Sequence, residues 1–229
     1  SRTIRGKSFK FFILLAYNSK ILYKFAHVII VINHRIMEQQ VKQVPYGVAD
    51  FAKVMTQNLY YVDKTMFLPE LEKQPRNLFF IRPRRFGKSI FLSMLYSYYD
   101  CNQKSKFEKL FGSLWIGQHP TALQGKYQVL FLDFSQITGK IDILEERFNA
   151  YLSINLDAFV RQYAQYYQEE KDEILSKTNY ADKLELVFKA AKAHEYPLYL
   201  IIDEYDNFTN VVLNEHGEKV YHAITHADG

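Results

Sequence analysis

The sequence is poor in several features that mark other classes of protein. It has a single cysteine, Cys101, in 229 residues, which excludes an intrachain disulfide and a multi-cysteine zinc site. It has no unbroken run of about 18–20 apolar residues, the length that a transmembrane helix needs. We therefore expect a cytoplasmic protein without stable membrane association.

Acidic residues are absent from the first 36 positions. Residues 1–36 carry seven of the 29 Lys and Arg residues, so the remainder holds 22 of them against all 25 Asp and Glu residues. The positive net charge is therefore no argument for a nucleic-acid-binding domain. The first methionine is Met37, and we interpret residues 1–36 as an extraneous or disordered basic leader. A weak segment lying on a membrane surface is the alternative.

The rest of the chain has the composition of a globular domain, with 48% hydrophobic and 16% aromatic residues over the whole sequence. Buried strands are predicted at Asn77–Ile81, Gln128–Asp133 and Leu198–Asp203, and helices at Asp50–Gln57, Lys64–Lys73, Lys88–Tyr99, Ile141–Tyr167 and Ala181–His194. Apolar strands separated by helices imply a parallel sheet covered on both faces. We predict an α/β fold, with residues 37–229 as one incomplete domain.

A phosphate-binding pattern follows the first predicted strand. Residues 82–89 read Arg-Pro-Arg-Arg-Phe-Gly-Lys-Ser. They keep the spacing of the phosphate loop (P-loop), but Arg82 replaces its first glycine. The N-terminus of a helix attracts anions and disfavours cations, yet Arg82, Arg84, Arg85 and Lys88 all precede or open this helix. A bound polyphosphate would account for these charges, and a solvated basic turn is the alternative.

A nucleotide site of this kind also needs a carboxylate that holds magnesium at the tip of a neighbouring strand. Asp203 and Glu204 end the apolar segment Leu-Tyr-Leu-Ile-Ile and supply that carboxylate and an adjacent base. Asp133 is the rival, but Phe134 follows it and offers no base. We therefore favour the pair Asp203 and Glu204, with Asp133 as an acidic strand tip near the site.

These residues predict a site for ATP and Mg²⁺. Lys88 would neutralise phosphate charge, Ser89 and Asp203 would hold the metal, and Glu204 would polarise the attacking water. Lys88 and Glu204 are thus the candidate catalytic residues. The nucleotide-binding set comprises Arg82, Arg84, Arg85, Phe86, Gly87, Lys88, Ser89 and Asp203.

Several motifs resemble those of the predicted AAA-ATPase-like family common in Bacteroidetes, over most of residues 41–229. They are Pro45-Tyr46-Gly47, Tyr60–Thr65, Arg82–Ser89, Tyr98–Asp100, Val129–Ser135 and Ile202–Phe208. The resemblance implies an additional-strand P-loop NTPase fold, a three-layer sandwich with a mainly parallel sheet, here truncated at the C-terminus. Relatives usually continue into a nuclease-like domain of the PD-(D/E)XK type. The resemblance thus implies regulation of such a domain, with nucleic acid as a candidate partner through it. Formation of an oligomer is compatible with the sequence.

Three functions remain open. The first is an ATP-binding, ATP-hydrolysing domain. The second is a nucleotide-sensing binding module with little or no hydrolysis, which Arg82 favours because a residue other than glycine restricts the approach of the backbone to phosphate. The third is a structural remnant without a ligand. His222 and His226 lie four residues apart on a predicted helix but lack a third ligand, so we interpret them as surface residues rather than a metal site.

Overall fold

The computed structural model describes residues 42–75, 77–81, 85–138 and 141–206. The chain divides into two compact units, one of Ser1–Pro45 with Asn58–Tyr60 and one of Tyr46–Gln57 with Tyr61–Gly229. In the first unit, the Tyr60 amide donates a hydrogen bond to the Gln43 carbonyl at 2.8 Å. All the elements described below belong to the second unit. The predicted leader and the two histidines at 222 and 226 lie outside the described residues.

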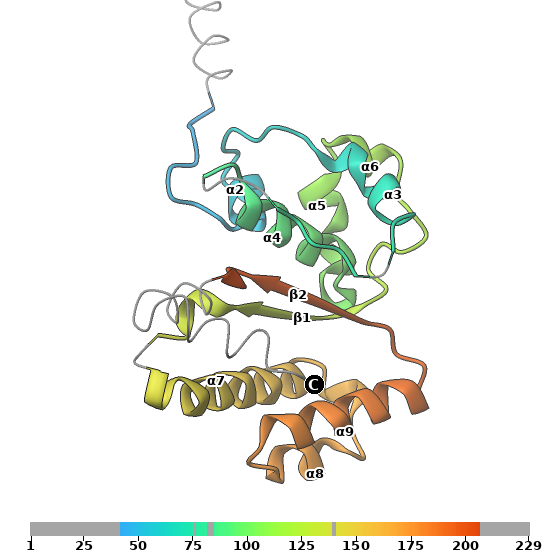
Figure 1. Cartoon of the computed structure of the whole chain (residues 1–229). Coiled ribbons are helices and arrows are strands. Elements are labelled where there is room, and N and C mark those ends of the chain that lie inside the picture. The colour runs from blue at the N-terminus through green and yellow to red at the C-terminus, as the bar shows by residue number, and fades with distance from the viewer. Residues whose placement is uncertain (1–41, 76, 82–84, 139–140, 207–229) are drawn as a thin grey trace, which may run out of the picture. The chain divides into compact units, whose positions relative to one another are not determined.

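Among the described residues of the second unit, two parallel strands form a sheet (Figure 1). The first is β1 (Gln128–Asp133) and the second is β2 (Leu198–Asp203), and both have the bounds that the sequence predicts. Their register pairs Gln128 with Leu198 and ends with Asp133 opposite Asp203. The α/β class is confirmed, and two strand tips carrying carboxylates lie side by side.

A helix covers each face of this pair of strands (Figure 1). On one face Val129 and Ile201 join a core with α4 (Lys88–Tyr99). On the other face Leu130 and Leu198 pack with residues of α7 (Ile141–Gln162) and α9 (Tyr180–Ala193). Because successive side chains of a strand point to opposite faces, a strand that is apolar throughout requires such cover on both sides.

The remaining elements are short. They are α2 (Phe51–Thr56), η1 (Thr65–Phe67), α3 (Leu68–Leu71), η2 (Cys101–Lys106), α5 (Phe107–Phe111), α6 (Trp115–Gln118), η3 (Phe134–Gln136), η4 (Ala164–Tyr166) and α8 (Lys171–Ser176). Phe51 of α2 and Phe111 of α5 pack against each other in the core beside α4, with their rings tilted by 31°. None of the helices in the described part of the chain combines the length and apolar character that a membrane crossing requires.

The prediction of a buried strand at Asn77–Ile81 is wrong. These residues form no strand, and Phe79 and Ile81 are each 81% exposed. Phe80 is half-buried and stacks on Phe91, with ring centroids 4.8 Å apart. An apolar run predicts a strand only where a hydrogen-bonded neighbour is present, and among the described residues β2 pairs with β1 alone.

The two edges of the sheet differ. The outer edge of β1 is closed by side chains that follow it in sequence. The Val129 amide donates to the Tyr163 hydroxyl at 2.9 Å, and the Asp133 amide donates to the Tyr151 hydroxyl at 2.7 Å. At the start of the strand, the Tyr127 amide donates to the Tyr99 carbonyl at 2.9 Å. The outer edge of β2 has no such closure by the described residues, and Leu200 in its centre is 54% exposed.

Candidate nucleotide site

Helix α4 begins without a side-chain cap. Its N-cap residue is Gly87, with φ 77° and ψ 31°, and none of the residues in the first turn is acidic. A side chain at Gly87 would have space, since an added Cβ would lie 3.4 Å from Ile90 Cγ2, but the left-handed backbone disfavours any residue other than glycine. Glycine therefore sets the turn that leaves the first N–H groups of α4 available to an anion.

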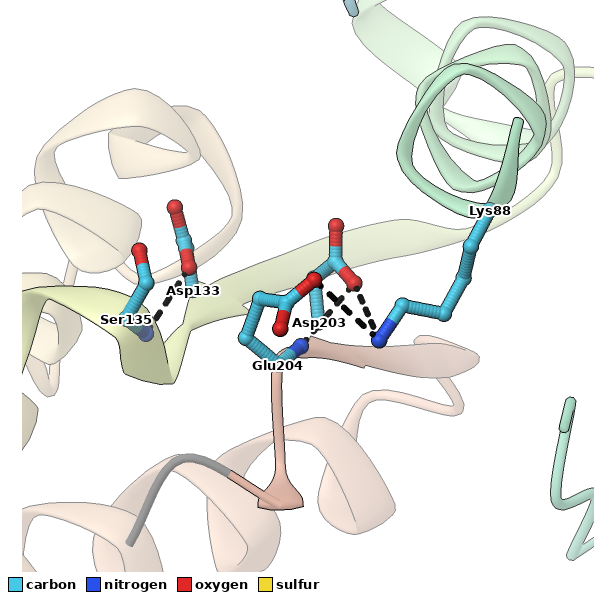
Figure 2. A network of polar contacts seen from close by, with 5 residues as sticks. All are labelled: Lys88, Asp133, Ser135, Asp203 and Glu204. Carbon is cyan, nitrogen blue, oxygen red and sulfur yellow. Dashed lines mark hydrogen bonds and ion pairs between the residues drawn. The ribbon is translucent and has the colours of Figure 1, made fainter. Parts of the chain in front are cut away.

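Lys88, the first residue of α4, reaches across to the end of β2 (Figure 2). Its Nζ lies 3.2 Å from Asp203 Oδ1 and 3.4 Å from Glu204 Oε1. The same ammonium lies 5.6 Å from the ring centre of Tyr205. One cation is thus held by two carboxylates and the face of an aromatic ring.

The surroundings of Lys88 keep it charged. Its side chain is 19% exposed, and that of Asp203 is 6% exposed. Burial by itself lowers the pKa of the Lys88 ammonium, but hydrogen bonds to and charges on Asp203 and Glu204 outweigh this effect, so the pKa is raised. Lys88 therefore stays protonated, and its ion pair with Asp203 is partly shielded from water.

A tight turn after β2 brings Glu204 back toward Lys88. Glu204 has φ 51°, in the left-handed region that non-glycine residues seldom adopt. Its amide donates to Asp203 Oδ1 at 2.9 Å, which holds the turn. A left-handed residue costs of order 1 kcal/mol and is often found at functional sites. Here it lets two successive carboxylates face one cation.

Asp133 lies beside this cluster but takes no part in the ion pair (Figure 2). It is the register partner of Asp203 on β1. Its Oδ1 accepts a hydrogen bond at 3.0 Å from the Ser135 amide, so Asp133 caps the short helix η3. The geometry therefore distinguishes the two strand tips, and the one that faces Lys88 is Asp203.

A cavity of about 750 Å³ adjoins the ion pair. One end is lined by Ser89, Asp133, Asp203 and Glu204, and the rest extends along β1 between α4 and α7. Its volume is in the range of small-molecule sites, roughly 300–1,000 Å³. An uncapped helix N-terminus, a lysine and two carboxylates thus meet at the wall of a cavity that is large enough for a nucleotide.

Comparison with known proteins identifies the family of the chain. The family model described as Predicted AAA-ATPase matches residues 45–227, which is most of the chain. The chain belongs to this family. The match includes the loop before α4 and both strand tips. Membership makes a nucleotide-binding, ATPase-like function the general expectation for this chain.

One curated relative of this AAA-ATPase family member is described as "Uncharacterized protein in vnfD 5'region", from Azotobacter chroococcum mcd 1. The two are 32% identical over 173 residues, which cover 72% of this chain and 29% of the relative. The chain thus matches less than a third of that protein's length. No solved structure matches the chain.

The structure brings together some of the residues that the sequence selects in this AAA-ATPase family member. Lys88, Ser89, Asp203 and Glu204 all line the cavity or meet in the ion pair. Arg85 is exposed and has φ 66°, and Phe86 is also exposed. Arg82 and Arg84 lie outside the described residues. Sequence reasoning missed Tyr205, although its position directly after the two carboxylates could have indicated a contact with Lys88.

Proposed function

We propose that this AAA-ATPase family member binds ATP together with Mg²⁺ at the N-terminus of α4 and hydrolyses the nucleotide. The observation that carries the proposal is the meeting of Lys88 with Asp203 and Glu204 beside an uncapped helix start. A basic turn without a ligand gives no reason for two carboxylates at the end of a strand to be held against its lysine, partly shielded from water. A triphosphate accounts for both the cations and the carboxylates.

In the proposed complex, the triphosphate lies against the first N–H groups of α4. Lys88 exchanges its carboxylate partners for the β- and γ-phosphate oxygens. Arg85, together with Arg82 and Arg84, contributes further positive charge where the usual glycine-rich loop would contribute backbone N–H groups. Glu204, which is 41% exposed and directed to the same place, orients the attacking water.

The donor atoms fit a hard cation. Carboxylate oxygens of Asp203 and Glu204 and the hydroxyl of Ser89 lie at one end of the cavity, and oxygen donors are those that Mg²⁺ prefers. The Lys88 ammonium between the two carboxylates already shows that the place accepts positive charge. The described residues form no cluster of three or more metal-binding side chains. This fits Mg²⁺, which keeps waters and substrate phosphates as ligands, and whose bound form would neutralise phosphate charge.

We further propose that the sheet is larger than two strands and forms the three-layer P-loop sandwich. The outer side of β2 supports this extension. The outer edge of β2 is unpaired within the described residues, and Leu200 is exposed in its centre. A further strand beside β2 would provide the missing neighbour.

The alternative is a nucleotide-sensing module that binds ATP and hardly hydrolyses it. The arginine at position 82 favours this alternative, because it replaces the glycine that lets backbone approach phosphate closely. The Glu204→Gln variant separates the two functions. Hydrolysis predicts a loss of phosphate release of about a hundredfold or more with ATP affinity retained. Phosphate release that is negligible in wild type and unchanged in the variant, with ATP still bound, would identify the sensing module.

The site fits a role as the control element of a longer protein. The aligned residues cover 29% of the curated relative's length. We propose that nucleotide binding regulates an appended nuclease-like domain, with nucleic acid as the partner of that domain. The single cysteine is consistent with a protein that functions in the reducing cytoplasm.

A further inference from the structure

We propose that Lys88 blocks the carboxylates of Asp203 and Glu204 against free divalent cations, and that a triphosphate removes this block. This inference rests on the proposed function, because it concerns the state of the site before the nucleotide arrives. It assigns Lys88 a second role, that of a residue which decides in what order the site accepts its ligands.

The block follows from the position of the ammonium. Lys88 Nζ lies within 3.2 Å of Asp203 Oδ1 and within 3.4 Å of Glu204 Oε1, so it occupies the space between the two oxygens that a cation would use. The ring of Tyr205 adds a third favourable contact on the same ammonium. A divalent ion entering here would have to displace a charged group that is already held on three sides.

Whether a metal can displace Lys88 depends on which other partners its ammonium can find. Asp203 is 5% exposed, so a negative charge on its carboxylate is costly unless a positive group lies beside it. If a metal displaced Lys88 without a nucleotide, the ammonium would be left beside the metal with no carboxylate of its own. A triphosphate changes this balance, since its oxygens give Lys88 new partners at the N-terminus of the same helix. Asp203 then becomes free for the metal that accompanies the phosphates, and Glu204 for the attacking water.

The site should therefore select the metal–nucleotide complex over the free metal. In the nucleotide-free protein, the carboxylate pair should bind a divalent ion weakly despite its two negative charges. Removing the ammonium should turn the same pair into an ordinary metal site. A lysine with a purely catalytic role predicts a different result, because its loss would leave the affinity for a free metal unchanged.

The test measures binding of Mn²⁺ alone, without nucleotide, by electron paramagnetic resonance in wild type, Lys88→Met and Lys106→Met. Mn²⁺ shares the preference of Mg²⁺ for carboxylate oxygens. Lys106→Met is the matched control, because Lys106 also lines the cavity but does not pair with Asp203 or Glu204. We expect Lys88→Met to bind Mn²⁺ about ten- to a hundredfold more tightly than wild type, the range of one or two charge-assisted contacts. Lys106→Met should stay within a few-fold of wild type, and Lys88→Met with Asp203→Asn should lose the gain.

Equal Mn²⁺ affinities in wild type and Lys88→Met would overturn the inference, as would equal gains in both lysine variants. If Lys88→Met does not fold, Lys88→Gln replaces it, because its amide still gives the buried Asp203 a hydrogen-bond donor while the charge is gone. ATP binding is measured separately on wild type. A gain in Mn²⁺ affinity in a protein that does not bind ATP would refute the proposed function and leave the block intact.

Discussion

Asp133 and Asp203 are direct partners in the register of β1 and β2, yet Lys88 pairs only with Asp203 of the two. Asp133 instead accepts a hydrogen bond from the Ser135 amide in the turn that follows β1. Two carboxylates at the tips of adjacent strands therefore have different surroundings. One faces a lysine at the start of a helix, and the other caps the short helix η3 through the Ser135 amide. This difference makes the two aspartates a matched pair for experiment.

We expect Asp203→Asn to lower Mg²⁺-dependent phosphate release by about a hundredfold or more, because it removes the charge that is proposed to hold the metal. Asp133→Asn keeps the acceptor oxygen for Ser135 and should change phosphate release little. Both rates are measured at saturating ATP. Equal losses in the two variants would contradict the assignment of the metal-holding role to Asp203.

We expect Arg85→Ala and Lys88→Ala each to weaken ATP binding by about ten- to a hundredfold, since each removes a charge-assisted contact to phosphate. Adenosine has no phosphates, so its affinity should stay the same in both variants. Titration calorimetry with the two ligands measures this difference. If ATP affinity is unchanged in both variants, the phosphate loop is not at residues 82–89.

The edge of β1 provides a test of the fold. Tyr163→Phe removes the hydroxyl that accepts from the Val129 amide, and both residues are buried. A buried amide left without an acceptor costs about 1–3 kcal/mol, so we expect the free energy of unfolding to fall by that amount in urea. Tyr180→Phe is the control, because the Tyr180 hydroxyl has no hydrogen bond to the described residues. Equal effects of the two substitutions would show that the hydroxyl of Tyr163 is not what holds the edge.

Asp100 should make stability depend on pH. It is fully buried, and burial raises the pKa of its carboxyl above the ordinary value of 3.8. The folded state therefore holds the proton more tightly than the unfolded state. Its contribution to stability is complete below about pH 3.9 and declines as the pH rises through the folded-state pKa.

Asp100→Asn cannot ionise and should lack this dependence. We expect the free energy of unfolding of wild type, relative to that of the variant, to fall as the pH rises from about 4 toward neutrality. Urea unfolding at a series of pH values measures the difference between the two proteins. A difference that stays constant, or that grows with pH, would contradict the raised pKa.

Elements with a strong periodic pattern could be predicted from the sequence. The bounds of α4, β1 and β2 follow from apolar runs and from spacing, and the polar residues at their ends stop them where predicted. The convergence of Lys88 and Asp203 also agrees with the sequence, which predicts that the start of α4 lies at the carboxyl edge of a parallel sheet.

Other features depend on tertiary contacts that no local pattern contains. Asn77–Ile81 reads as a strand in isolation but lacks a strand neighbour among the described residues. The helices α5, α6 and α8 have six residues or fewer, too short for a clear amphipathic period. Likewise, the left-handed turn at Glu204, which directs its carboxylate at Lys88, is a backbone conformation that a glutamate does not indicate.

The unequal edges of the sheet decide on which side it can grow. Hydroxyls of Tyr151 and Tyr163 occupy donors on the outer edge of β1, whereas the described residues leave the outer edge of β2 open. Unpaired N–H and C=O groups on an edge strand are a template for another strand, so the open side of β2 is where a further strand can add to this sheet. At the outer edge of β1, the amides of Val129 and Asp133 already donate to tyrosine hydroxyls, so fewer backbone donors remain there for a neighbouring strand.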